Sequence, residues 1–189
     1  MKCRIRKTVG IFALAGIAAL SPALCVGQAI AGRAGDSAVS PAAPASTAGT
    51  LLLKGLAGHE PITLGLPAFK AMPHVAVTVH NPHSNADESY SGVALIELLA
   101  KVGAPRGKEL HGKGLSDYVV ATGSDGYKAV LALAEIDPEF HSGSVIVADQ
   151  MDGKALDAKS GPFKLVVSED KRPARSVRNL VSVEVRAAE

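Results

Sequence analysis

Cysteine is nearly absent from this 189-residue chain. The only two cysteines, Cys3 and Cys25, lie within the first 31 residues, which have the parts of a secretory signal peptide. These parts are a basic start, an apolar run from Thr8 to Leu20 and then small residues. Removal of this leader would leave a chain with no disulfide, no thiolate nucleophile and no cysteine metal ligand.

The apolar run of the leader is too short to span a bilayer comfortably. We expect cleavage after Ala31, because Ala29-Ile30-Ala31 is a small-x-small triplet a few residues beyond Pro22. A lipid anchor on Cys25 is the alternative, but no small residue directly precedes that cysteine. The sequence therefore predicts a signal peptide over residues 1–31 and a mature protein in the periplasm or secreted.

An excess of basic residues is also missing once the leader is set aside. The leader holds four of the 20 Lys and Arg and none of the 18 Asp and Glu, so the net charge changes from +2 to −2. Such a balance does not favour nucleic acid or an anionic membrane as a partner. We expect no nucleic-acid partner and no membrane span in the mature form.

The remaining chain divides into a linker and one domain. Residues 32–49 are mostly small residues, proline and threonine, a composition that predicts a flexible linker. No internal repeat or second linker follows, so residues 50–187 are predicted to form a single domain.

Short segments of strand character alternate with turn signals through this domain. The predicted strands are Leu51 to Leu53, Val75 to Val79, Tyr118 to Thr122, Tyr127 to Leu133, Val145 to Ala148, Phe163 to Val167 and Leu180 to Val185. Asp125-Gly126 and Asp152-Gly153 predict tight turns between strands. The last strand alternates apolar and polar residues, as an antiparallel strand with one wet face does.

One helix is strongly marked. After Gly92, one apolar stripe is formed by Leu95, Leu98, Leu99 and Val102. Gly103 and Pro105 end it. The predicted fold class is α+β: sheet-rich, with mostly antiparallel strands and one or two helices.

Several short motifs follow one another in a familiar order. They are Tyr90-Ser91-Gly92-Val93 with Leu95 and Leu98-Leu99, then Asp125-Gly126-Tyr127, Asp152-Gly153, Gly161-Pro162-Phe163-Lys164-Leu165-Val166-Val167 and Val177-Arg178-Asn179-Leu180. In order and spacing they resemble the molybdopterin-binding domain of the sulfite-oxidase-type oxidoreductases. The resemblance implies a compact α+β domain that holds a molybdenum-pterin cofactor, with the metal bound to a protein thiolate.

The chain departs from this pattern at the metal ligand. The resemblance places the cysteine between the strand at Val75 to Val79 and Tyr90, and that interval contains none. Serine, asparagine or imidazole cannot replace a soft thiolate without changing the metal's electronics. The leader agrees, because Arg4 and Arg6 are separated by Ile5, whereas export of a folded, loaded molybdenum enzyme calls for adjacent arginines.

A cluster of cations offers a candidate anion site. Lys171, Arg172, Arg175 and Arg178 lie within eight residues, between two predicted strands. If the segment turns helically, the three arginines share one side and form a fork-like pocket for phosphate or pyrophosphate. The resemblance implies that a basic residue at the place of Arg178 contacts the cofactor. A solvated loop that protects an edge strand is the alternative interpretation.

A second candidate is the segment that contains His80 and His83. Imidazole is a common transition-metal ligand, so these histidines could collect zinc or copper, although surface or capping roles are the commoner alternative. Tyr90 borders this segment, and we include it with both histidines among the candidate cofactor-binding residues. Tyr118 and Tyr127 are instead predicted to be cross-strand packing partners.

Other catalytic chemistry has little support. The chain has no G-x-S-x-G turn, and Asp125 and Asp152 lie in turns, where their side chains bond the local backbone. Three hypotheses remain. The first is an exported oxidoreductase-like domain that binds a pterin-type or other anionic ligand, or a periplasmic redox partner, without cysteine-ligated molybdenum. The second is an active molybdenum oxidoreductase with a non-cysteine ligand such as His80. The third is a histidine-based metal-binding or interaction module.

Overall fold

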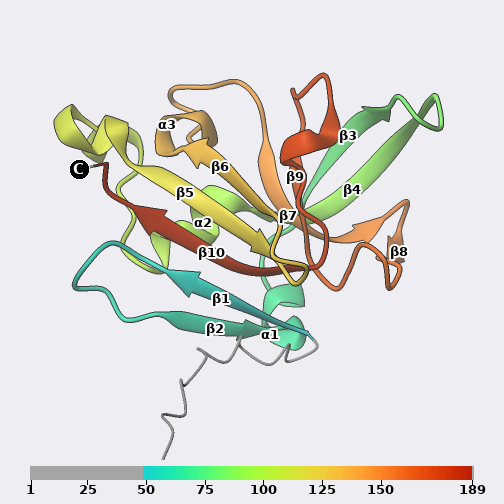
Figure 1. The fold of residues 1–189 in the computed structure, drawn as a ribbon, viewed down its shortest axis with the longest axis horizontal. Coiled ribbons are helices and arrows are strands. Elements are labelled where there is room, and N and C mark those ends of the chain that lie inside the picture. The colour runs from blue at the N-terminus through green and yellow to red at the C-terminus, as the bar shows by residue number, and fades with distance from the viewer. Residues whose placement is uncertain (1–48, 189) are drawn as a thin grey trace, which may run out of the picture. The chain divides into compact units, whose positions relative to one another are not determined.

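The computed structural model describes residues 49–188 of the chain (Figure 1). The predicted signal peptide and the predicted linker, apart from Gly49, lie outside the described residues. Residues 49–188 form two five-stranded sheets, with three short α-helices between strands. This architecture is the sheet-rich α+β fold that the sequence predicts.

The first sheet has the strand order β2-β1-β10-β5-β6. Its strands are β1 (Thr50–Lys54), β2 (Ile62–Gly65), β5 (Tyr118–Gly123), β6 (Lys128–Ala132) and β10 (Leu180–Arg186). β10 is central and pairs antiparallel with β5 but parallel with β1, so its predicted antiparallel pairing holds on one side only. Alternation alone does not reveal the direction of a neighbouring strand. Val183 and Val185 of β10 are buried and Glu184 between them is partly exposed, as expected.

The second sheet has the order β3-β4-β7-β8, and β9 pairs with β7 as well. Its strands are β3 (Val75–Asn81), β4 (Ala86–Ala94), β7 (Val145–Met151), β8 (Lys154–Ala155) and β9 (Lys164–Val167). Asp152 and Gly153 join β7 to β8 with φ of 51° and 73°, which is the tight turn that this pair of residues predicts. Neighbouring strands of this sheet all run antiparallel.

The helices are short. They are α1 (Leu66–Lys70), α2 (Leu95–Ala100) and α3 (Leu133–Ile136), and the 3₁₀ turns are η1 (Gly107–Glu109), η2 (Gly112–Ser116) and η3 (Pro173–Arg175). α2 is the predicted helix, and it buries Leu95, Leu98 and Leu99 against the core. α1 and α3 are too short to show a helical period, which explains why the sequence predicts one or two helices rather than three.

The main core unites the inner faces of the two sheets. Val147 and Leu165 of the second sheet belong to the same buried cluster as Leu53 and Val183 of the first. The second sheet also buries a smaller cluster on its other face, formed by Val77, Tyr90, Ile146, Ala148 and Val166. Strands apolar on both faces need a cover on each side. The candidate site lies beside this smaller cluster.

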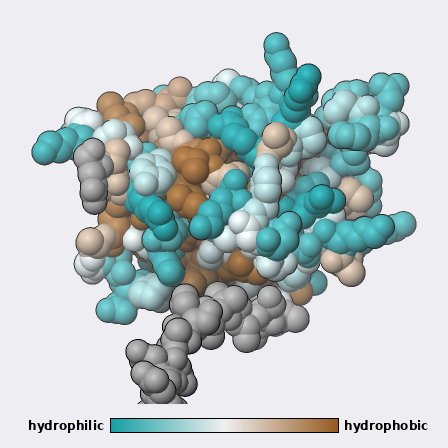
Figure 2. All heavy atoms as spheres, viewed as in Figure 1, coloured by the Kyte–Doolittle hydropathy of each residue, from teal (hydrophilic) through white to brown (hydrophobic). Residues whose placement is uncertain are grey.

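The exterior is mostly polar. Figure 2 shows one face, on which hydrophilic side chains dominate and apolar side chains gather over β5 and β6. Val130 of β6 is among the exposed large apolar residues, at 54% exposure. No helix within residues 49–188 is long and apolar enough to cross a membrane.

Candidate functional site

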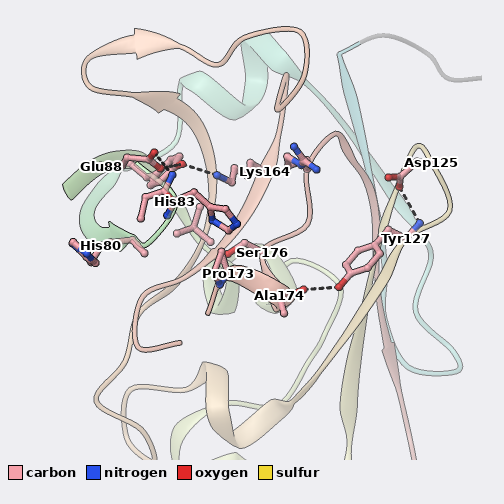
Figure 3. A pocket seen from close by; sticks show the side chains of 14 residues that line it. His80, His83, Glu88, Asp125, Tyr127, Lys164, Pro173, Ala174 and Ser176 are labelled. Atoms are coloured by element: carbon pink, nitrogen blue, oxygen red, sulfur yellow. Dashed lines mark hydrogen bonds between the residues drawn. The ribbon is translucent and has the colours of Figure 1, made fainter. Parts of the chain in front are cut away.

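A cavity of about 550 Å³ opens beside the smaller apolar cluster (Figure 3). Four parts of the chain line it: the β3–β4 hairpin (Val79, His80, Asn81, His83, Glu88, Tyr90), β9 (Lys164, Val166), the β5–β6 turn (Asp125, Tyr127) and the segment before β10 (Pro173, Ala174, Ser176, Arg178). The cavity therefore joins residues from both ends of the domain sequence.

Lys164 reaches Tyr90 across the second sheet. Lys164 pairs in register with Ala148, and Ala148 pairs with Gly92, so this row of the sheet has only a methyl group and a hydrogen beside the lysine. The long side chain can therefore lie over β7. Its Nζ donates a hydrogen bond of 2.5 Å to Tyr90 Oη and lies 4.2 Å from the ring centroid.

Tyr90 also forms a hydrogen bond with Glu88. Its hydroxyl donates to Glu88 Oε2 at 2.6 Å, and Asn81 Nδ2 donates to Glu88 Oε1 at 2.6 Å. Burial raises the pKa of Glu88, but the hydrogen bonds from Tyr90 and Asn81 and the charge of Lys164 outweigh it, so the net pKa lies below its usual value. Burial, followed by the bond to Glu88, raises the pKa of Tyr90 well above its usual value. Tyr90 is therefore a neutral donor to an ionised carboxylate.

Two cations meet at the cavity. Burial lowers the pKa of Lys164, Glu88 raises it, and the positive charge of Arg178 lowers it further. The net direction is downward, so the surroundings do not fully compensate the ammonium charge. An anion placed between Lys164 and Arg178 would supply that compensation, and this makes the pair suited to phosphate or carboxylate.

The β5–β6 turn places Tyr127 at the cavity rather than in a strand. β6 begins at Lys128, and the Tyr127 backbone N–H donates to Asp125 Oδ1 at 2.9 Å within the turn. The phenol is 49% exposed and donates to the carbonyl of Ala174 at 2.6 Å (Figure 3). The prediction that Tyr127 is a cross-strand packing partner is therefore wrong, because the turn extends one residue further than expected.

The two histidines of the hairpin point in different directions. Figure 3 shows His83 directed into the cavity and His80 directed away from it. His80 Nδ1 lies 2.8 Å from Asp87 Oδ1, and both side chains are more than half exposed. The imidazoles do not converge. Among residues 49–188 there is no group of three or more His, Cys, Asp or Glu that could hold a metal ion.

The structure separates the predicted arginines. Arg178 lines the cavity with Lys164, and Arg172 is exposed and does not line it. Arg175 lines a second cavity, where it pairs with Asp170 and Glu135. The expectation that all three share one side is wrong, because the 3₁₀ turn ends at Arg175 and the backbone is extended at Ser176. A spacing of three residues marks one face only in a continuous helix.

Lys164 and Glu88 are site residues that the sequence analysis did not select. Lys164 stands at the start of a predicted strand within the Gly-Pro-Phe-Lys motif, where a lone charge is typical of a strand end. Its partner Tyr90 lies 74 residues away, and their meeting depends on the order β4-β7-β9. A partly buried charge beside small residues is the signal that could identify Lys164, and it is visible only once the strand register is known.

The donors present fit part of a molybdenum-pterin group. Lys164 and Arg178 suit its phosphate, and the polar hairpin residues suit hydrogen bonding to a pterin. The described residues contain no thiolate, and the segment where the resemblance places one is a β-hairpin closed by residues 82–85. The metal-binding half of the group therefore does not fit these residues.

Known proteins allow a direct comparison of fold. The sulfane dehydrogenase SoxCD from Paracoccus pantotrophus is similar, with a TM-score of 0.56 and 17% identity. The alignment covers 75% of this chain and 39% of that one, so this chain spans well under half of that protein's length. At this identity the likeness shows the fold alone. No curated protein matches the chain.

The family comparison covers most of the sequence. Residues 44–189 match the family described as "Oxidoreductase molybdopterin binding domain". This stretch includes both sheets, the cavity and every motif on which the resemblance rests. The chain therefore belongs to the oxidoreductase molybdopterin-binding domain family.

Proposed function

We propose that this domain binds a phosphate-bearing, pterin-type ligand in the cavity, with Lys164 and Arg178 as its anion-binding groups. The observation that carries the proposal is that Lys164 and Arg178 line one cavity at a partly buried site, where burial and then the charge of Arg178 lower the pKa of Lys164. A bound phosphate would offset both effects. Membership of a molybdopterin-binding family supports the choice of a pterin.

The other residues of the site have supporting roles in this proposal. Tyr90 and Glu88 hold the lysine side chain across the sheet, so its ammonium group is positioned before a ligand arrives. Tyr127 offers a half-exposed ring at the cavity edge, against which a flat heterocycle can pack. His83 supplies a further polar group directed into the cavity.

We further propose that the domain acts without cysteine-ligated molybdenum. Cys3 and Cys25 are the only cysteines of the chain, and both belong to the predicted leader. The proposal includes export by that leader, which removes both thiols and delivers the domain to the periplasm or the exterior. A periplasmic redox partner would then have to supply any electron-transfer centre.

Calorimetric titration tests the ligand site directly. Neopterin phosphate is a suitable probe, and neopterin without phosphate is the matched ligand control. We expect Lys164→Met to weaken binding of the phosphorylated probe by about tenfold or more, since a desolvated charge contact is lost. Lys128→Met, on an exposed lysine that lines neither cavity, should leave it unchanged. Equal affinity for the two pterins would overturn the phosphate assignment.

Metal analysis tests the second part of the proposal. Protein purified from its natural compartment, after expression of the full chain, should contain no molybdenum. One equivalent of molybdenum with extractable pterin would overturn the proposal that this domain acts without molybdenum chemistry. His80→Ala would then show whether the imidazole retains the metal.

A further inference from the structure

One wall of the ligand cavity is a short exposed segment, residues 170–176, which we call the wall segment. Pro173, Ala174 and Ser176 of this segment line the cavity. Its 3₁₀ turn, η3, buries no side chain. Directly after it, Val177 is buried and its carbonyl accepts a hydrogen bond of 2.8 Å from Leu165 of β9. Packing therefore fixes the end of the segment but not its turn.

Arg175 anchors the turn through hydrogen bonds and lines the second cavity, not the ligand cavity. Its Nη2 and Nε donate to the two carboxylate oxygens of Asp170 at 2.6 and 3.0 Å, which closes the segment on itself. Its Nη1 donates to Glu135 Oε1 of α3 at 3.2 Å. These three residues line the second cavity, of about 190 Å³, so the wall segment contributes residues to both cavities.

Tyr127 holds the same turn from the ligand side. Its hydroxyl donates to the Ala174 carbonyl, the residue directly before Arg175. The turn itself is closed by the Ser176 N–H, which donates to the Pro173 carbonyl at 3.1 Å. A segment with no buried apolar side chain depends on such polar ties for its position. The paired guanidinium is the strongest of these ties, because its bonds to Asp170 are charge-assisted and bidentate.

We propose that Arg175 is a positioning residue of the ligand site: it fixes the cavity wall through Asp170 and Glu135. This inference rests on the proposed ligand-binding function. It gives Arg175 a different role from Arg178, which lines the ligand cavity itself. Loosening the wall would let Ala174 and Tyr127 move away from the ligand, so affinity falls although no ligand contact is removed.

Two measurements on the protein obtained by expression of the full chain test this role. The first is the affinity for neopterin phosphate, and the second is amide hydrogen exchange at Ser176 and Leu165 without ligand. In Arg175→Gln we expect affinity to fall about tenfold, as for the loss of a bidentate charged pair. Exchange at Ser176 should be faster, and exchange at Leu165, which lies within β9, should be unchanged.

Matched variants separate this role from a general loss of structure. Asp170→Asn keeps Arg175 and its bonds to Glu135, and should show the same two changes more weakly. Arg186→Gln removes an exposed arginine that pairs with Glu184 at 3.0 Å and lines neither cavity. That variant should change neither measurement.

The outcomes distinguish the inference from the function on which it rests. Unchanged Ser176 exchange in Arg175→Gln overturns the positioning role whatever the affinity does. Faster exchange with unchanged affinity overturns it too, because the wall then moves without effect on the ligand. Absence of binding by the unmodified protein overturns the proposed function first, and the positioning role with it.

Discussion

Lys164 of β9 and Tyr90 of β4 meet across β7 through a hydrogen bond of 2.5 Å and a contact of the ammonium group with the ring face. The two residues do not lie on neighbouring strands, because β7 stands between β4 and β9. Their contact exists because the intervening row of the sheet has only Gly92 and Ala148 beside Lys164. Gly92 and Ala148 thus leave room for the contact between the ammonium group of Lys164 and the ring of Tyr90.

Tyr90→Phe should disturb this arrangement without leaving a large void. The variant keeps the ring but removes the acceptor for Lys164 and one donor to Glu88. We expect a loss of about 1–3 kcal/mol in the free energy of unfolding, typical of a buried polar group left without its partner. Urea denaturation measures it. Tyr118→Phe, on a tyrosine that lines neither cavity, is the control, and an equal loss in both variants would contradict a special role for Tyr90.

The pH dependence of stability should reveal the state of Glu88. Burial raises its pKa, but its hydrogen bonds and Lys164 lower it more, so the pKa in the folded protein lies below its usual value of 4.5. The folded protein therefore binds fewer protons than the unfolded chain near that pH. This contribution to stability is complete above pH 4.5 and is lost as pH falls through the folded pKa.

Glu88→Gln provides the measurement for this contribution. The variant cannot ionise at this position, so its unfolding free energy should fall less steeply than that of the unmodified protein below pH 4.5. Denaturation curves between pH 7 and pH 3 give the comparison. Parallel pH profiles for the two proteins would show that Glu88 has no shifted pKa.

A second His–Asp contact joins His74 and Asp149, and it is far less exposed than the contact of His80 with Asp87. His74 Nδ1 lies 2.7 Å from the Met72 carbonyl, and Nε2 lies 3.1 Å from Asp149 Oδ1. Both ring nitrogens of His74 therefore lie within hydrogen-bond distance of an oxygen atom. Asp149 Oδ2 is buried and has no hydrogen-bond partner among residues 49–188. The Asp149 side chain is therefore held by its contact with His74 through Oδ1.

Asp149→Ala should therefore be costly. It leaves His74 without its carboxylate partner and opens a small void, and we expect a loss of about 3 kcal/mol in unfolding free energy. Asp87→Ala removes the exposed partner of His80 and should cost less than about 1 kcal/mol. Urea denaturation of the two variants compares the loss of an aspartate partner of histidine at a buried position and at an exposed one. Similar losses would show that burial does not govern the His74 pair.

Local signals in the sequence were sufficient for most of the fold. Runs of apolar and β-branched residues predicted β1, β3, β5, β6, β7, β9 and β10, Asp152-Gly153 predicted a turn, and the stripe from Leu95 predicted α2. Strands β2, β4 and β8 were not predicted. The ordered motifs also predicted the family that residues 44–189 match. Such features depend on residues close together in the chain, which is why they are visible without a structure.

The candidate site depends on longer-range information. His80, His83, Tyr90 and Arg178 are candidate cofactor-binding residues from the sequence that line the cavity, and their role in ligand binding stays a prediction. Lys164 was not selected, because its partner is fixed by strand order. The spacing groups Arg175 with Arg178, but the backbone is extended at Ser176 between them, and Arg175 pairs with Asp170 instead. The surroundings of Lys164 depend on strand register, and those of Arg175 depend on where one 3₁₀ turn ends.

Substitution of Gly92 tests how closely β4 and β7 approach each other beside the site. A Cβ added there would overlap the backbone carbonyl of Val147, because the β4–β7 register shifts between Ser91 and Gly92 and brings the two backbones together. Gly92→Ala should therefore cost more than about 3 kcal/mol in unfolding free energy, since backbone atoms cannot move aside as a flexible side chain does.

Gly126→Ala isolates the part of such a loss that comes from backbone conformation alone. Gly126 has φ of 82° in the β5–β6 turn, and nothing lies within 4 Å of an added Cβ. We expect a cost of about 1 kcal/mol for an alanine in the left-handed region. Urea denaturation of both variants gives the difference. Equal losses would mean that no close backbone approach exists at Gly92.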